Sequence, residues 1–262
     1  MDQGTSREVP RMNLLNGVFE WLTDPENWHK TFLGPGIPQR IGEHLQYTGL
    51  AILIAAVIAV PLGTYIGHTG RGGFLVVGVA NSFRALPELG LLILLVLAMG
   101  VALALQAVTI ALVLLAIPPL LAGTYAGVRN VDRDVVDAAR GMGMRERDVV
   151  LKVELPIALP LILGGLRAAT LQVIATASIA AFVSLGGLGR YVIDGRAFGG
   201  ADGYTEMAGG AVLIAVLAIA VEVTLAGVQR LAVSPGLRTA KISRRVTRVR
   251  MRPVEEPEGA IA

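Results

Sequence analysis

The chain has 262 residues, of which 53% are hydrophobic, 16% are charged and none is cysteine; its formal net charge is +3. Soluble domains average about 25% charged residues, so this composition argues against an ordinary soluble protein, and the lack of cysteine excludes disulfides, thiolate nucleophiles and Cys-ligated metal sites. The apolar excess, together with 32 glycines, suits helices that pack closely in lipid. The sequence therefore predicts an all-α integral membrane protein.

Residues 1–45 precede the first long apolar run, and we predict that they form an N-terminal amphipathic segment at the membrane interface. Its apolar residues recur at helical spacing: Leu14, Leu15, Val18, Phe19 and Leu22. Trp21 and Trp28 lie on either side of a predicted turn at Asp24 and Pro25. Amphipathic helices with tryptophans commonly lie in the headgroup plane.

Five apolar runs follow within residues 46–232, and we predict that each crosses the bilayer, which takes about 20 residues. They are residues 47–67, 73–101, 107–128, 160–185 and 207–231. The second run contains Arg84, Pro87 and Glu88, so two interpretations stay open. Either a surface helix ends near Arg84, or one long helix kinks at Pro87.

The distribution of Lys and Arg predicts the orientation. Five spans place the basic regions 129–167 and 230–252 on the same side as the loop at 68–72. That side carries 16 Lys and Arg, against 6 on the other side, and the positive-inside rule assigns the richer side to the cytoplasm. Residues 233–262 are then a disordered cytoplasmic tail. Because the basic blocks border apolar runs, we expect a lipid bilayer and no nucleic acid as a partner.

No arrangement of residues indicates catalysis or nucleotide binding. The P-loop pattern G-x-x-x-x-G-K-[ST] is missing, and so is the nucleophile elbow G-x-S-x-G. The three histidines, His29, His44 and His68, are scattered and form no H-x-x-x-H pair. We therefore expect no catalytic residue, no metal and no cofactor.

Residues 129–159 are predicted to form a cytoplasmic loop with two short helices and a glycine hinge. Asn130 or Asp132 can cap the first helix, and Gly143 stands where a C′ glycine would end it. Ala138 and Ala139 give that helix a face of small side chains on which another protein can pack closely. From the spacing alone, a docking element and a solvated hairpin without a partner are equally compatible with this loop.

The second short helix of the loop is predicted to end near Leu155. Asp148 and Lys152 form an i,i+4 pair on it. Pro156 disfavours helix at the residue that precedes it, so we expect a break before the fourth span.

The loop resembles the EAA motif of bacterial ABC importer permeases, which reads Glu-Ala-Ala, three residues, Gly, nine residues, Ile, one residue and Leu-Pro. The matching residues are Asp137, Ala138, Ala139, Gly143, Val153, Leu155 and Pro156. Asp137 and Val153 replace the Glu and Ile of the pattern. In such permeases the loop docks in a cleft of an ATPase subunit. The resemblance implies a type I importer fold in which residues 137–144 contact the ATPase.

Further segments are similar to permeases for glycine betaine, choline and related osmoprotectants, over roughly residues 25–232. These segments are residues 25–28, 43–45, 66–71, 84–87 and 184–189. The methionine-import permease group shares the loop, the Arg-x-x-Pro and the Gly-Gly-x-Gly segment, and it is the alternative within the family. An ATP-independent channel or secondary transporter, or a membrane enzyme, would be alternatives from other classes.

The resemblance implies a permease subunit, not itself an enzyme, that crosses a bacterial cytoplasmic membrane several times with its C-terminus in the cytoplasm. Its implied partners are ABC ATPase subunits, an extracytoplasmic substrate-binding protein and a second permease chain, identical or paralogous. Because both tryptophans precede the first span, no tryptophan cage is expected within the spans. Selectivity is then expected mainly from the binding protein.

Polar and glycine residues within or beside the predicted spans are candidates for a pathway or gate. They are Arg84, Pro87, Glu88, Gly186, Gly187, Gly189 and Glu222. Arg84 and Glu88 can pair across a helix break or line the mouth of a pathway, whereas a gate role for the glycines is implied by the family alone. Glu222 lies too far from Arg230 for a direct pair, and Arg167 is expected to snorkel to the cytoplasmic surface.

Overall fold

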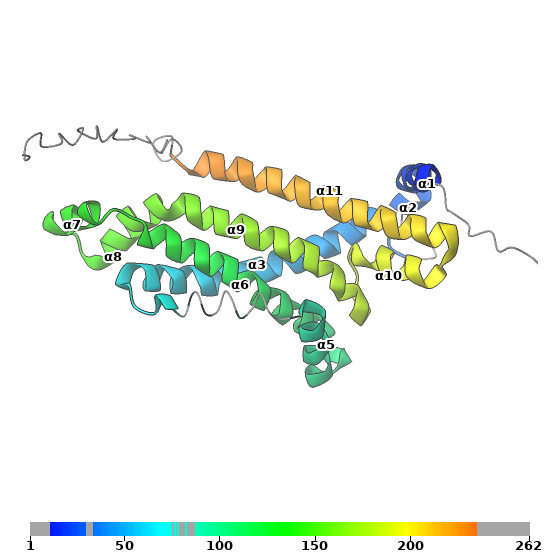
Figure 1. The fold of residues 1–262 in the computed structure, drawn as a ribbon, viewed down its shortest axis with the longest axis horizontal. Coiled ribbons are helices and arrows are strands. Elements are labelled where there is room, and N and C mark those ends of the chain that lie inside the picture. Colours follow the sequence, from blue (N-terminus) through cyan, green and yellow to red (C-terminus); the bar gives the residue numbers. More distant parts are fainter. Residues whose placement is uncertain are drawn as a thin grey trace, which may run out of the picture.

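The protein is described from a computed structural model, which covers residues 11–29, 34–74, 76, 78, 82 and 87–234. The elements of this described part are all helices, as the composition predicts (Figure 1). In chain order they are α1 (Arg11–Thr23), α2 (Pro25–Trp28), α3 (Ile37–Thr69), α5 (Glu88–Met99), η1 (Val101–Leu103), α6 (Ala104–Arg129), α7 (Arg133–Gly141), α8 (Glu146–Val149), η2 (Val150–Glu154), α9 (Leu155–Ala177), η3 (Ser178–Val183), α10 (Gly189–Phe198) and α11 (Gly200–Ala232).

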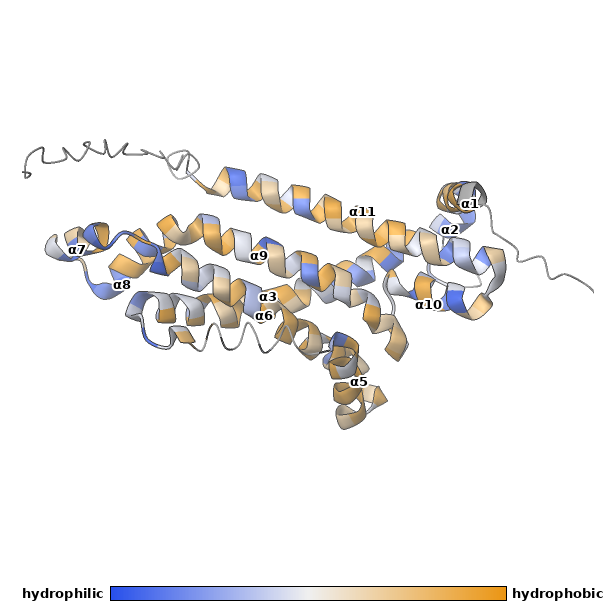
Figure 2. Ribbon diagram, viewed as in Figure 1, coloured by the Kyte–Doolittle hydropathy of each residue, from blue (hydrophilic) through white to orange (hydrophobic). Residues whose placement is uncertain are grey.

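Four helical segments in the described part are long and apolar enough to cross a membrane. They are Ile37–Thr69, Val101–Arg129, Glu146–Val183 and Gly200–Ala232, and the apolar helix α5 is shorter, with 12 residues. Figure 2 shows hydrophobic residues along these long helices and hydrophilic residues around α7 and α8 at one end. The fold class is therefore the predicted helical membrane bundle, while the limits of each span within a bilayer stay predictions.

The long helices extend beyond the apolar runs that mark them in the sequence. α3 begins at Ile37, inside the segment predicted to be interfacial, and α11 begins at Gly200 rather than near Met207. The start of α3 has Gly36 as its N-cap and a proline in its first turn, which is a favoured position for proline. Hydropathy locates the lipid-facing part of a helix but not the polar turns that continue it.

Pro87 is the N-cap of a helix. Its backbone is extended, with φ −68° and ψ 113°, and α5 starts at the next residue, Glu88. One helix that bends through Pro87 is therefore wrong as an interpretation of the second run. Arg84 lies outside the described residues, so the proposed Arg84–Glu88 pair stays a prediction.

The predicted helix break before Pro156 is also wrong. The chain passes from α8 through the π-helical turn η2 directly into α9. The backbone N–H of Leu155 donates to the carbonyl of Val150, five residues back. Proline clashes with a regular helix because its ring meets the carbonyl four residues earlier, and the wider turn ahead of Pro156 accommodates it within a continuous helix.

Small residues bring the central helices close together. Ala51, Ala55 and Ala59 of α3 are fully buried four residues apart. On α6, a Cβ added at Gly123 would lie 2.8 Å from the Cα of Gly165 in α9. α6 packs against both α3 and α9, whereas α11 contacts α9, α10 and α1. Close backbone approach of this kind is the packing mode that lipid favours.

Candidate functional site

The loop at 129–159 has a small apolar core of its own. Val131, Val136, Ala139 and Val149 are buried in it, and Met144 packs against them. Asp132 caps α7, since its side chain accepts a hydrogen bond of 3.0 Å from the backbone N–H of Asp134. The predicted cap is thereby confirmed, with Asp132 rather than Asn130 in that role.

Gly143 ends α7 as the spacing predicts. Its φ is +84°, in the left-handed region that glycine adopts at low cost. The N–H of Gly143 donates to the carbonyl of Arg140 at 2.9 Å, and the N–H of Met144 donates to the carbonyl of Ala139 at 3.2 Å. These two bonds form a Schellman motif. The motif explains the glycine at position 143.

The two predicted alanines of the loop differ in burial on α7. Ala139 is buried in the loop core, while Ala138 and Asp137 are exposed. Val135 and Met142 are exposed as well, at 44% and 78%. Because positions three and four apart share a helix face, Val135, Ala138 and Met142 form one outward apolar face. We call these three residues the α7 face.

The remaining predicted loop residues lie in the helix that follows. Val153 is partly buried in η2 and packs against the loop core, Leu155 begins α9, and Pro156 is exposed in its first turn. The predicted ion pair between Lys152 and Asp148 is present, with 2.6 Å between the charged atoms. These residues therefore join the loop core to α9.

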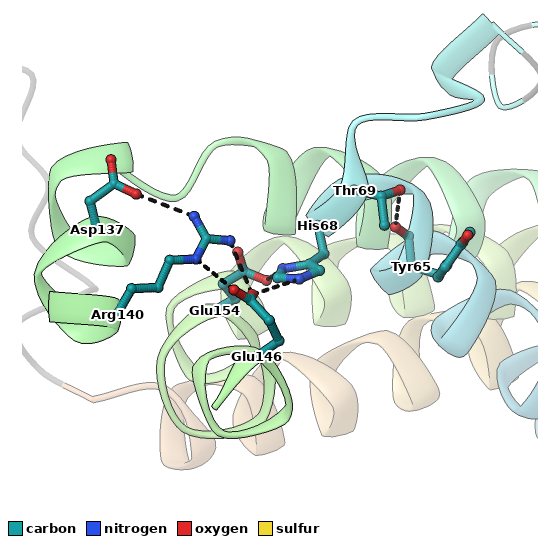
Figure 3. A network of polar contacts seen from close by, with 7 residues as sticks. All are labelled: Tyr65, His68, Thr69, Asp137, Arg140, Glu146 and Glu154. Atoms are coloured by element: carbon teal, nitrogen blue, oxygen red, sulfur yellow. Dashed lines mark hydrogen bonds and ion pairs between the residues drawn. The ribbon is translucent and has the colours of Figure 1, made fainter. Parts of the chain in front are cut away.

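A chain of polar contacts connects α7 to the end of α3 (Figure 3). His68 of α3 lies between two carboxylates: its Nδ1 is 2.8 Å from Oε2 of Glu154, and its Nε2 is 3.2 Å from Oε2 of Glu146. Arg140 of α7 donates to both carboxylate oxygens of Glu146, at 2.9 and 3.0 Å, and to Asp137 at 3.2 Å. We call these five residues the His68 network.

Charge and burial differ along the His68 network. The hydrogen bonds from Arg140 hold the pKa of the Glu146 carboxyl below its usual value, and the same bonds raise the pKa of Arg140. Both residues are exposed, whereas Glu154 is buried, with its side chain only 2% exposed. A buried carboxylate requires a partner, and the ring of His68 is the hydrogen-bond partner of Glu154.

Sequence reasoning noted His68 within a segment but missed the network. Glu154 was the available signal, because an acidic residue that opens an apolar run needs a cation or donor nearby. Its partner is 86 residues away in the sequence, and helix spacing alone could not identify it.

Glu222 and Arg167 form an ion pair between α11 and α9. Arg167 also donates to the side chain of Gln229 at 2.7 Å, and Gln229 donates to the carbonyl of Pro160 at 3.0 Å. Arg167 therefore has an acidic partner on the neighbouring helix, which stabilises its charge, and its predicted snorkelling to the cytoplasmic surface stays a prediction.

Glu88 contacts α9, since it accepts a hydrogen bond of 2.8 Å from the hydroxyl of Thr176. The predicted glycines Gly186, Gly187 and Gly189 lie in and just after the turn between η3 and α10. The N–H of Gly187 donates to Glu43 of α3 at 2.7 Å. This glycine turn is at the end of the bundle away from α7 (Figure 1). The structure thus does not bring the glycines and the 129–159 loop together.

Among the described residues, no group of three or more His, Asp or Glu side chains could hold a metal ion. His44 is fully buried and contacts the carbonyl of Ile174 at 2.9 Å. The loop presents an apolar contact surface, the α7 face, and the polar contacts of the His68 network connect α7 to the membrane helix α3. This arrangement suits docking of another protein and transmission of its motion to α3.

Comparison with known proteins identifies relatives of this chain. The carnitine transport permease protein OpuCD of Listeria monocytogenes is 34% identical over 197 residues, which cover 75% of this chain and 86% of that protein. The glycine betaine/carnitine/choline transport system permease protein OpuCB of Bacillus subtilis is 32% identical over 220 residues, covering 82% and 98%. The choline transport system permease protein OpuBB of Bacillus subtilis is 32% identical over 201 residues, covering 76% and 89%.

The fold is similar to a chain in the inward-facing structure of the MetNI methionine ABC transporter. The TM-score is 0.66 with 23% identity, over 76% of this chain and 96% of that chain. A family model described as "Binding-protein-dependent transport system inner membrane component" matches residues 47–239. This chain belongs to that family, and it is a multi-pass membrane permease of the binding-protein-dependent transport systems.

Proposed function

We propose that this chain is the permease subunit of an ATP-driven importer for a quaternary ammonium osmoprotectant, such as glycine betaine, carnitine or choline. The relatives named for these solutes, at 32 to 34% identity over most of both chains, support this substrate class. The likeness to a methionine transporter at 23% identity concerns the fold.

The α7 face supports the part of the proposal that concerns binding of an ATPase subunit. Val135, Ala138 and Met142 are exposed on a helix that the loop core and the Schellman motif hold in place. A rigid helix with a small central residue and apolar neighbours can enter a cleft of another protein. We propose that an ABC ATPase subunit binds this face, and that ATP is hydrolysed on that subunit and not on this chain.

The His68 network supports a route for the motion. Arg140 on the docking helix contacts Glu146, and Glu146 contacts His68 at the end of α3. A shift of α7 against the ATPase would therefore be transmitted to a membrane helix through charged contacts as well as through the chain itself. We propose that this connection converts ATPase closure into movement of α3.

The remaining assembly follows from the same proposal. The α7 end faces the cytoplasm of a bacterium, as the excess of Lys and Arg in that part of the sequence supports, and the C-terminus lies on that side too. A second permease chain completes the pathway, and an extracytoplasmic binding protein delivers the solute to the opposite end.

Uptake in a strain that lacks its own osmoprotectant importers tests the substrate class. The chain is expressed with its cognate ATPase and binding protein, and uptake of labelled glycine betaine, carnitine, choline and methionine is measured. We expect ATP-dependent uptake of at least one quaternary ammonium solute and none of methionine. Methionine uptake alone, or uptake that continues with a hydrolysis-deficient ATPase, would contradict the proposal.

A further inference from the structure

A cavity of about 470 Å³ lies among α1, α2, the beginning of α3, α10 and the beginning of α11. These elements are at the end of the bundle away from α7 (Figure 1). Small-molecule sites typically measure about 300–1,000 Å³, so the cavity is large enough for a small solute. Its lining includes Trp21, Arg40, Arg190, Tyr191, Asp194 and Glu206.

Two aromatic rings form part of the cavity wall. The rings of Trp21 and Tyr191 are 5.0 Å apart between centroids and nearly perpendicular, at 81°. Each residue packs on one of two adjacent glycines of α11: a Cβ added at Gly209 would run into the ring of Trp21, and one at Gly210 would lie 2.7 Å from the Cβ of Tyr191. The two glycines thus hold aromatic residues from α1 and α10 side by side.

The charges around the cavity leave a carboxylate free. Arg190 pairs with Asp194 within α10, and Arg40 is 3.5 Å from Glu43. Glu206 lines the cavity near the charges of Arg40 and Asp194, and no hydrogen bond or close ion pair joins its side chain to another described residue. The aromatic rings and this carboxylate therefore lie in a cavity whose two arginines are already paired.

We propose that this cavity binds the quaternary ammonium group of the transported solute. A cation over an aromatic face gains about 0.5–2 kcal/mol, and quaternary ammonium groups are recognised in this way; the carboxylate of Glu206 adds attraction. The choice of a quaternary ammonium ligand rests on the proposed function. Trp21 precedes the first predicted span, yet it packs on Gly209 of α11, so a tryptophan can line a cavity beside a long helix without lying within a span.

Fluorescence of Trp21 tests binding directly, because the chain has only two tryptophans. The full-length chain with Trp28→Phe is placed in lipid nanodiscs and titrated with choline chloride, with potassium chloride as the ionic-strength control. We expect a saturable change with choline only. Glu206→Gln should weaken binding roughly tenfold, as expected for the loss of about 1.4 kcal/mol. Glu20→Gln, an exposed change on α1 away from the cavity lining, should leave it unchanged.

The results separate this proposal from the proposed function. If the assembled importer takes up choline but Trp21 fluorescence shows no saturable change, the cavity is not a binding site and the proposed function stands. Equal affinities for the Glu206→Gln and Glu20→Gln chains would also overturn the proposal. Saturable binding that depends on Glu206, in an importer that transports no quaternary ammonium solute, would support the cavity and contradict the proposed function.

Discussion

Replacing His68 with leucine, alone and together with Glu154, should separate the effect of the His68 network on stability from its effect on solute uptake. His68 is the hydrogen-bond partner of Glu154, whose side chain is 2% exposed, at 2.8 Å. Removing one partner of a buried hydrogen bond costs about 1–3 kcal/mol, because it leaves the buried carboxyl of Glu154 unsatisfied. Glu146 is 59% exposed, so water replaces its lost contact and that loss adds little. The buried contact therefore dominates the expected loss.

We expect His68→Leu to lower the free energy of unfolding by about 1–3 kcal/mol in detergent micelles. The double variant His68→Leu/Glu154→Leu should recover most of that stability, since replacing both partners of a buried hydrogen bond by apolar groups can be nearly neutral. Uptake should stay low in both variants, because the contact between α3 and Glu146 is lost in each. Arg71→Leu, an exposed change three residues further on, is the control.

Two results would refute this reasoning. If His68→Leu unfolds at the same denaturant concentration as Arg71→Leu, Glu154 does not depend on the histidine. If the double variant regains wild-type uptake along with stability, the His68 network supports the fold but transmits no motion.

Three further predictions concern docking, packing and orientation. Gly143→Trp and Gly200→Trp both place tryptophan at a positive φ, with nothing within 4 Å of the added Cβ, so both variants should insert into the membrane. Only Gly143→Trp should abolish solute uptake and ATPase co-purification. Equal uptake by the two variants would contradict docking of the ATPase at this loop. The Cβ of Gly123→Leu would meet the backbone of α9, whereas the Cβ of Gly164→Leu would meet nothing within 4 Å. Only Gly123→Leu should therefore reduce the yield of folded protein. The cysteine of Arg145→Cys should resist an impermeant thiol reagent in intact cells and react after lysis. Labelling before lysis would contradict the predicted cytoplasmic orientation of the loop.

Local features of the loop could be predicted from the sequence because their causes lie within a few residues. Asp132 caps α7 through a backbone N–H two residues away, and Gly143 ends α7 through bonds that span at most five residues. The pair of Asp148 and Lys152 is one helical turn apart. Patterns of this length are fixed by helix geometry alone.

Features that depend on packing between distant helices could not be predicted in the same way. Glu222 meets Arg167 across 55 residues of sequence, and His68 meets Glu154 across 86. The helix through Pro156 depends on the π-helical turn ahead of it, a rearrangement that proline rules do not anticipate. Trp21 lies on Gly209 because α1 folds back onto α11.

Site-specific cross-linking from the α7 face tests the central claim most directly. Because the chain has no cysteine, a photoreactive maleimide can be attached at Ala138→Cys alone. The control is Ala201→Cys, at an exposed position in the first turn of α11, and α11 begins at the end of the bundle away from α7 (Figure 1). In the assembled importer we expect Ala138→Cys to cross-link to the ATPase subunit and Ala201→Cys not to do so. Absence of an ATPase product from Ala138→Cys, in a complex that still transports solute, would contradict the claim that this helix couples the ATPase to the membrane helices.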